Sequence, residues 1–136
     1  MKIGWRQKSK HPDIAKDVED FHHRFQFPDP RYPRWPDKGV VGVRLKLIRE
    51  ETDELIAAIE SPNRSFVKVA REAIDVVYVA IGVFVDFGLP FVPCWKAVHS
   101  ANMSKKACPD GGKPSKPNTW APPDEIISEA IGPRKP

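Results

Sequence analysis

Two pairs of carboxylates dominate the chemistry that this chain could perform: Glu51 with Glu54, and Glu72 with Asp75. The members of each pair are three residues apart, so on an α-helix they lie about 60° from each other and point to one side. Carboxylate oxygens suit hard divalent cations such as Mg²⁺, which take waters and substrate phosphates as their remaining ligands. The pattern raises the hypothesis of a metal site, against the alternative of acids solvated on helix surfaces.

The two acidic pairs are expected to meet in space because a short turn separates their helices. Residues 55–71 lie between Glu54 and Glu72, and residues 61–64 have the composition of a turn. A short connection makes the helices antiparallel neighbours and sets both pairs at a similar depth. Four acids at one level repel one another unless cations bridge them, which favours the metal interpretation.

Simple surface ion pairs are the alternative for the second pair of acids. Lys68 precedes Glu72 by four residues and Arg71 precedes Asp75 by four, which is the spacing of ion pairs along a helix. Taken alone, this helix favours such ion pairs. Only the combination of the second acidic pair with the first favours a metal site.

The apolar pattern predicts an all-α protein, a four-helix bundle with a proline-rich loop and a C-terminal tail. Helices are expected over residues 13–25, 41–59 and 65–87 and from Pro93, with a short last helix after Pro122. No segment has the clean alternation of a strand. The helix over 65–87 is apolar around most of its circumference, which predicts the centre of the bundle. Four short helices can hardly cover it, so we expect an oligomer.

Within these helices the pattern also predicts which faces pack. On the helix over 41–59, the predicted core face is Leu45, Ile48, Thr52, Leu55, Ile56 and Ile59. Glu51 and Glu54 fall at the margin of this face, where acids are less easily explained by solvation. His22 and His23 are interpreted as residues at the boundary of the core. In the fourth helix, Asn102 and Lys105 extend a face that begins with Trp95 and Val98.

Two loop segments leave alternatives open. In the loop over residues 27–39, Tyr32 and Trp35 sit among basic residues, so they could stack on a base or pack onto the helical core. Residues 107–122 form a tail rich in Gly, Pro and Lys. It could wrap a phosphate chain, or it could be a solvated linker.

Length and composition indicate one domain over residues 1–136, with a core at about 13–106 and a tail at 107–136. The net charge of +4 favours an anionic partner. A basic leader over residues 1–12 is followed by no apolar segment, so we expect neither a signal peptide nor a membrane partner. Cys94 and Cys108 fit a reduced, cytoplasmic protein, and their spacing with His99 does not match a usual zinc site.

With these motifs in place, the chain resembles the MazG-like nucleoside triphosphate pyrophosphohydrolases, all-α enzymes related to dimeric dUTPases and phosphoribosyl-ATP pyrophosphohydrolases. Their signature is Glu-x-x-Glu, a spacer, then Glu-x-x-Asp. The resemblance covers about residues 13–125, including the runs at 44–51, 73–78 and 101–105, the Gly112-Lys113 and Lys116-Pro117 pairs, and the end at 122–124.

The resemblance implies cleavage of the α–β phosphoanhydride of a nucleotide, giving a monophosphate and pyrophosphate. It implies that Glu51, Glu54, Glu72 and Asp75 hold two or three Mg²⁺ or Mn²⁺ ions. The remaining expected roles are Glu50 as the base that takes a proton from water, and Asn102, Lys105, Lys113 and Lys116 as substrate-binding residues. Family members are dimers or tetramers, with sites partly completed by a neighbour.

A phage branch of the family, MazZ, acts on GTP and dGTP, and this small chain is similar to it, which implies a (d)GTP substrate and the host cytoplasm as its location. The competing hypotheses are a basic helical module that binds nucleic acid or nucleotides without catalysis, and a helical assembly protein without chemistry. Salt-sensitive oligonucleotide binding would mark the module. We expect the enzyme, with nucleic acid an unlikely partner.

Overall fold

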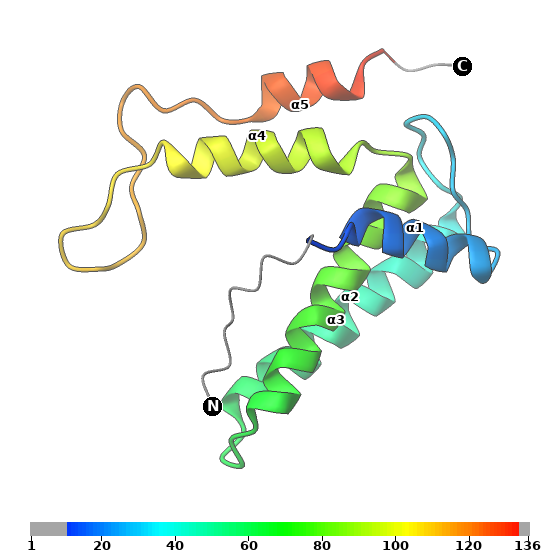
Figure 1. Ribbon diagram of the computed structural model, residues 1–136, viewed down its shortest axis with the longest axis horizontal. Helices are drawn as coiled ribbons and strands as arrows, with labels where there is room; N and C mark the ends of the chain where they lie inside the picture. Colours follow the sequence, from blue (N-terminus) through cyan, green and yellow to red (C-terminus); the bar gives the residue numbers. More distant parts are fainter. Residues whose placement is uncertain (1–10, 134–136) are drawn as a thin grey trace.

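The computed structural model describes residues 11–133, which are helical and contain no β-strand (Figure 1). The helices in this range are α1 (Ile14–Arg24), α2 (Lys38–Glu60), α3 (Phe66–Phe87), α4 (Phe91–Met103) and α5 (Asp124–Ile131). The predicted all-α class is therefore confirmed. The basic leader predicted over residues 1–12 falls almost entirely outside the described range. None of these helices is long and apolar enough to cross a bilayer.

Local sequence signals set the ends of α1 and α3. The side chains of Asp13 and Ser65 accept hydrogen bonds from the backbone N–H groups of Lys16 (3.0 Å) and Lys68 (3.2 Å), as N-caps. Gly88 ends α3 in the left-handed conformation, with φ of 64°. A Cβ at Gly88 would lie 2.2 Å from the carbonyl oxygen of Tyr32, so this glycine also lets the proline-rich loop approach α3.

The helices α2 and α3 form an antiparallel hairpin, and α1 packs across α3 (Figure 1). The more buried side of α2 includes Leu47 and Ala58 together with Glu51, which the sequence analysis placed at the margin of the core face. Leu45 and Ile59, predicted for the core, are exposed, and so is Ile56. The predicted core face of α2 was therefore only partly right: Ile48, Thr52 and Leu55 are half-buried, but the packed side is rotated towards Glu51, whose carboxylate faces the hairpin.

The four-helix bundle is not completed within one chain. The helix α4 turns away from the hairpin and packs antiparallel to α5, burying Cys94, Ala97 and Ala101 (Figure 1). It meets the end of α3 through the rings of Phe84 and Phe91, whose centroids are 5.2 Å apart. The face of α4 that was predicted to pack, with Trp95 and Val98, is exposed.

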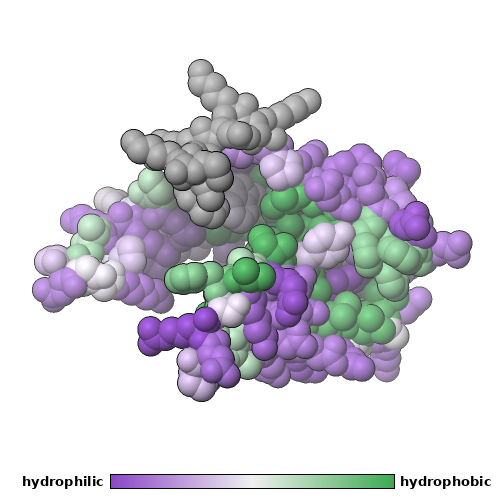
Figure 2. All heavy atoms as spheres, turned by 60° about the horizontal axis from the view of Figure 1, so that its bottom comes forward, coloured by the Kyte–Doolittle hydropathy of each residue, from purple (hydrophilic) through white to green (hydrophobic). Residues whose placement is uncertain are grey.

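Hydrophobic side chains gather at the surface of the molecule (Figure 2). The exposed ones include Phe66, Val67 and Ile74 on α3, where the sequence predicted a helix buried on most sides, and Trp95 on α4. Exposed apolar patches of this kind mark sites of interaction with other proteins or with ligands.

Candidate metal centre

Three of the four predicted metal ligands converge between α2 and α3. Glu51, Glu72 and Asp75 each offer a carboxylate oxygen, and these three oxygens lie within 4.8 Å of one another. Glu51 and Asp75 are half-buried and Glu72 is buried, so the cluster lies within the hairpin. Oxygen donors at this separation are the set that Mg²⁺ or Mn²⁺ requires, so the residues present fit a hard divalent cation.

The electrostatics of Glu51 show the cost of assembling this cluster. Burial raises the pKa of Glu51 above its ordinary value of 4.5, and the charges of Glu54, Asp75 and Glu72 raise it further. Among the described residues, no Lys or Arg forms an ion pair with Glu51 or Asp75. A divalent cation would supply the missing compensation.

Glu72 is compensated within the chain. Its carboxylate accepts hydrogen bonds from Arg71, with Nη2 at 2.8 Å and Nε at 3.3 Å from Oε1. The hydrogen bond from Arg71 holds the pKa of Glu72 below its ordinary value, against the effect of burial. The ion pairs predicted between Arg71 and Asp75 and between Lys68 and Glu72 do not form; Arg71 pairs with Glu72 instead.

The other two predicted acids lie at the edge of the cluster. Glu54 is exposed and is not among the three convergent oxygens, although its charge helps to raise the pKa of Glu51. Glu50 is exposed and lies 3.7 Å from Lys46 Nζ in a surface ion pair. Exposed ion pairs of this kind contribute little to stability.

A separate group of basic and polar side chains forms at the end of α4. Lys105 Nζ donates a hydrogen bond to Asn102 Oδ1 at 2.9 Å. Lys116 Nζ and Lys105 Nζ lie 4.4 and 5.8 Å from the ring centroid of Trp120. Trp120 Nε1 in turn donates to the carbonyl of Ala101 at 2.8 Å, which ties the tail to α4.

The structure does not bring this basic group to the acids within one chain. Lys113 is exposed, in the turn where Lys106 and Ser115 exchange two backbone hydrogen bonds of 2.9 Å. In Figure 1, the tail and the end of α4 lie apart from the α2–α3 hairpin. The predicted site residues therefore fall into two separate groups.

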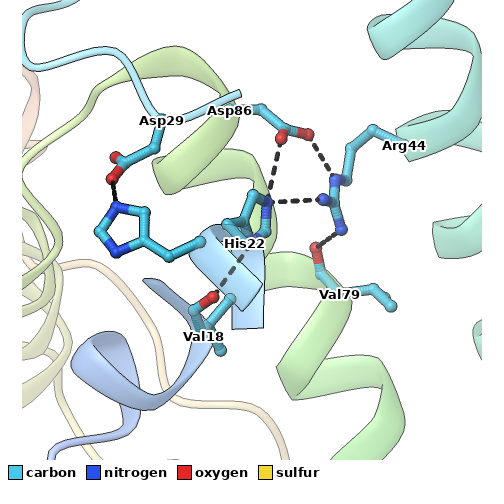
Figure 3. A network of polar contacts seen from close by, with 7 residues as sticks. Val18, His22, Asp29, Arg44, Val79 and Asp86 are labelled. Carbon is cyan, nitrogen blue, oxygen red and sulfur yellow. Dashed lines mark hydrogen bonds and ion pairs between the residues drawn. The ribbon is translucent and has the colours of Figure 1, made fainter. Parts of the chain in front are cut away.

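A buried ionic network, which the sequence analysis missed, links the first three helices (Figure 3). Asp86 of α3 faces His22 Nε2 at 3.0 Å and accepts from Arg44 Nε at 2.7 Å. His22 Nδ1 donates to the carbonyl of Val18 at 3.0 Å, and Arg44 Nη1 donates to that of Val79 at 3.3 Å. The interpretation of His22 as a boundary residue was wrong. The sequence signal for this network was a single ionisable residue on the apolar face of each helix, namely His22, Arg44 and Asp86.

The family match connects these features to known enzymes. Residues 18–102 match the phosphoribosyl-ATP pyrophosphohydrolases. The chain belongs to this family. None of the curated proteins compared with the chain matches it. The matched segment contains the four acids, the buried network and Asn102, whereas Lys105, Lys113 and Lys116 lie beyond its end.

Membership of the phosphoribosyl-ATP pyrophosphohydrolase family indicates a pyrophosphohydrolase type of activity, and such enzymes usually use a divalent metal. The predicted relationship to MazG-like all-α enzymes is confirmed at this level. The carboxylate cluster lies inside the matched segment, so the part of the chain that the family shares is the part that fits a metal.

In this family member an apolar cavity of about 440 Å³ lies between α1, α2 and α3, and two of its lining residues are one helical turn from the acids. Leu47 in its wall is one helical turn before Glu51, and Tyr78 is one turn after Asp75. Phe21 and Phe27 add aromatic surface, and the buried network closes the cavity with His22, Arg44 and Asp86. The cavity falls in the size range of small-molecule sites.

A second group of possible ligands lies on α1 and the loop after it. Glu19, His23 and Asp29 offer atoms within 4.8 Å of one another, and His23 pairs with Asp29. In this group His23 is exposed and Glu19 and Asp29 are half-buried, and the group is distant in sequence from the acids of α2 and α3. An exposed ion pair with a neighbouring glutamate accounts for it.

Proposed function

We propose that the chain hydrolyses a nucleoside or deoxynucleoside triphosphate to the monophosphate and pyrophosphate, with Mg²⁺ or Mn²⁺ as cofactor. The observation that carries this proposal is the convergence of Glu51, Glu72 and Asp75 inside a hairpin where, among the described residues, only Glu72 has a basic partner. These residues would hold two or three ions, with Glu54 as a further ligand from the edge of the cluster. Bound ions supply an activated water and neutralise the phosphates.

The remaining polar residues have roles that follow from their positions. Glu50 is about 40° from Glu54 around the helix and would take a proton from the attacking water. Lys105, Lys113 and Lys116 would bind phosphate oxygens and stabilise the leaving pyrophosphate. Asn102 would contact the sugar or a phosphate. The Asn102–Lys105 hydrogen bond holds the amide and the ammonium together for this task.

The apolar cavity next to the acids supports a nucleoside substrate. A base seated against Phe21, Phe27 or Tyr78 would place its phosphates one helical turn away, at the carboxylates. Guanine nucleotides are the first candidates, because of the resemblance to the MazZ branch. Phosphoribosyl-ATP is the second candidate substrate, since it is named by the matched family and carries the same triphosphate.

We propose that the enzyme is a homodimer or tetramer in which α4 and the tail of one copy complete the site of another. Two observations support this assembly. The basic group and the acids lie apart in one chain (Figure 1), and the face of α4 leading to Asn102 is apolar and exposed, with Trp95 61% accessible. Stacking this face on a second copy would bury it and carry the lysines to the acids.

A panel assay tests the proposed reaction. Eight NTPs and dNTPs and phosphoribosyl-ATP are each incubated with the protein and Mg²⁺, and released pyrophosphate is measured. We expect turnover of at least one nucleoside triphosphate, and its loss by more than about 100-fold in Glu54→Gln and Asp75→Asn. Asp53→Asn, an exposed position between the acids on α2, is the matched control and should keep full activity.

Each outcome of this assay has a distinct meaning. Folded protein that releases no pyrophosphate from any triphosphate would defeat the proposal. Turnover of phosphoribosyl-ATP alone would move the substrate to the second candidate. Near-normal rates in Glu54→Gln or in Asp75→Asn would remove that residue from the metal centre. Circular dichroism establishes that each variant keeps its helices.

A further inference from the structure

Arg71 occupies an unusual position beside the acidic cluster. It directly precedes Glu72 on α3, and its guanidinium contacts Glu72 Oε1 twice, with Nη2 at 2.8 Å and Nε at 3.3 Å. Glu72 is only 3% exposed, whereas the side chain of Arg71 is 65% exposed. A cation therefore reaches in from solvent to the most buried carboxylate of the cluster.

This contact is not an ordinary pairing of neighbours on a helix. Adjacent residues point about 100° apart, and ion pairs on helices form between residues three or four apart. Arg71 has such a partner available in Asp75, four residues on, yet its guanidinium turns to Glu72. The choice follows from burial, because a buried carboxylate without a partner costs far more than an exposed one.

The same carboxylate is needed by an ion in the proposed metal centre. Glu72 converges with Glu51 and Asp75, and Arg71 is the only basic partner of these three acids among the described residues. A divalent ion and the guanidinium would lie close together with like charge, so strong binding of both to Glu72 is unfavourable.

We infer that Arg71 is the resident counter-ion of the metal centre: it holds Glu72 until the first divalent ion displaces it. This inference rests on the proposed metal centre but not on the identity of the nucleotide. Arg71 keeps a buried carboxylate compensated in the metal-free protein, and it raises the metal concentration needed to fill the site. Because its side chain is 65% exposed, the displaced guanidinium can move into solvent.

Metal binding without nucleotide tests this inference. Mn²⁺ is titrated into the metal-free protein, and free Mn²⁺ is followed by electron paramagnetic resonance. Arg71→Met removes the competing hydrogen bonds, which are charge-assisted, and we expect Mn²⁺ to bind about tenfold more tightly. Lys68→Met removes one exposed positive charge a turn away on the same helix and should change the affinity by less than about twofold.

Thermal unfolding gives a second readout that does not depend on turnover. The metal-free Arg71→Met protein should melt below the wild type, because Glu72 is left buried without a partner. Saturating Mn²⁺ should then raise its melting temperature by more than it raises that of the wild type. If Arg71→Met does not fold, Arg71→Lys replaces it: the loss of the two-donor fork should tighten Mn²⁺ binding by a smaller factor.

The outcomes separate this inference from the proposed function. Wild-type protein that binds Mn²⁺ while Arg71→Met binds it no more tightly overturns the role of Arg71 and leaves the metal centre standing. Equal tightening in Lys68→Met overturns it too, since the effect would then be one of net charge. Wild-type protein that binds no Mn²⁺ overturns the metal centre, and the inference with it.

Discussion

Arg44 Nε and Asp86 Oδ2 lie 2.7 Å apart in the interior of the unit formed by α1, α2 and α3. The contact between α2 and α3 is therefore made partly by an ion pair. A Cβ at position 82 would lie 2.2 Å from Arg44 Nη1, so Gly82 provides the space that the guanidinium occupies. His22 of α1 joins the same carboxylate, so one buried aspartate links three helices and lines the apolar cavity between them (Figure 3).

Asp86→Asn should strongly destabilise the protein. Asp86 is 3% exposed, and removing its charge leaves the Arg44 guanidinium buried without a counter-ion. We expect a loss of about 3–5 kcal/mol in the free energy of unfolding, measured by urea denaturation. A double-mutant cycle with Arg44→Met isolates the pair. A loss below about 1 kcal/mol in Asp86→Asn would show that the network does not hold the helices together.

The same network predicts an acid limit to stability. Burial alone would raise the pKa of Asp86, but the hydrogen bonds from His22 and Arg44 outweigh it and hold the pKa below the ordinary value of 3.8. An acid with a lowered pKa in the folded state stabilises it above the unfolded value, and this stability is lost as the pH falls. The difference in unfolding free energy between wild type and Asp86→Asn should therefore shrink below pH 3.8.

Glu51→Gln should stabilise the metal-free protein at neutral pH. Burial and the neighbouring acids raise the pKa of Glu51 above 4.5, so its ionisation costs stability as the pH rises from that value through the folded pKa. Removing the charge should raise the melting temperature by about 2–4 °C at pH 7, with little change below pH 4.5. Mg²⁺ should raise the melting temperature of the wild type but not of this variant.

Asp53→Asn, exposed on the same helix, is the control. A melting temperature of Glu51→Gln below the wild type would contradict the crowding of acids at this site.

The convergence of Glu51, Glu72 and Asp75 was predictable because it depends on local rules. Spacing along a helix fixes which way each acid points, and a short turn fixes how two helices pair. The cap residues Asp13 and Ser65 and the terminator Gly88 set helix ends for the same reason. None of these features requires knowledge of distant contacts.

The buried network and the packed side of α2 were not predictable in this way. Leu45 and Ile59 are apolar yet exposed in one chain, and hydrophobicity alone does not tell a face that packs internally from one that serves another contact. Asp86 and His22 are 64 positions apart in sequence, so only the tertiary structure shows that their side chains are buried in contact with each other. For α4, the sequence predicted its apolar face but not the partner of that face.

Trp120→Phe should loosen the tail from the end of α4. The substitution removes the hydrogen bond from Nε1 to the carbonyl of Ala101 and leaves a smaller ring beneath Lys116. A loss of about 1 kcal/mol corresponds to a rise of roughly fivefold in the opening of the tail. Limited trypsin digestion should then cut after Lys106, at the start of the tail, about fivefold faster; the bonds after Lys113 and Lys116 precede prolines and are not trypsin sites. Trp35→Phe, an exposed tryptophan on the other loop, should not change the rate, and an unchanged rate in Trp120→Phe would mean that the tail is held by other contacts.

Mixing two inactive variants tests whether a site is shared between copies. Asp75→Asn damages the acidic half of the site and Lys105→Met damages the basic half, and these halves lie apart in one chain. If each site combines the acids of one copy with the lysine of another, a mixed dimer contains one site with both defects and one with none. Random exchange in an equal mixture should then restore about a quarter of the wild-type rate of pyrophosphate release.

A matched mixture controls for exchange and for residual activity. Asp75→Asn mixed with Glu51→Gln carries both defects on the acidic half, so every mixed dimer keeps two damaged sites and the rate should stay at the level of the separate variants. Restoration in both mixtures would point to stabilisation by assembly. Restoration in neither, with sedimentation showing that the copies have exchanged, would place the acids and Lys105 in the same chain's site. In that case α4 would have to fold back over the hairpin when substrate binds, and the exposed face of Trp95 and Val98 would be the surface that it uses.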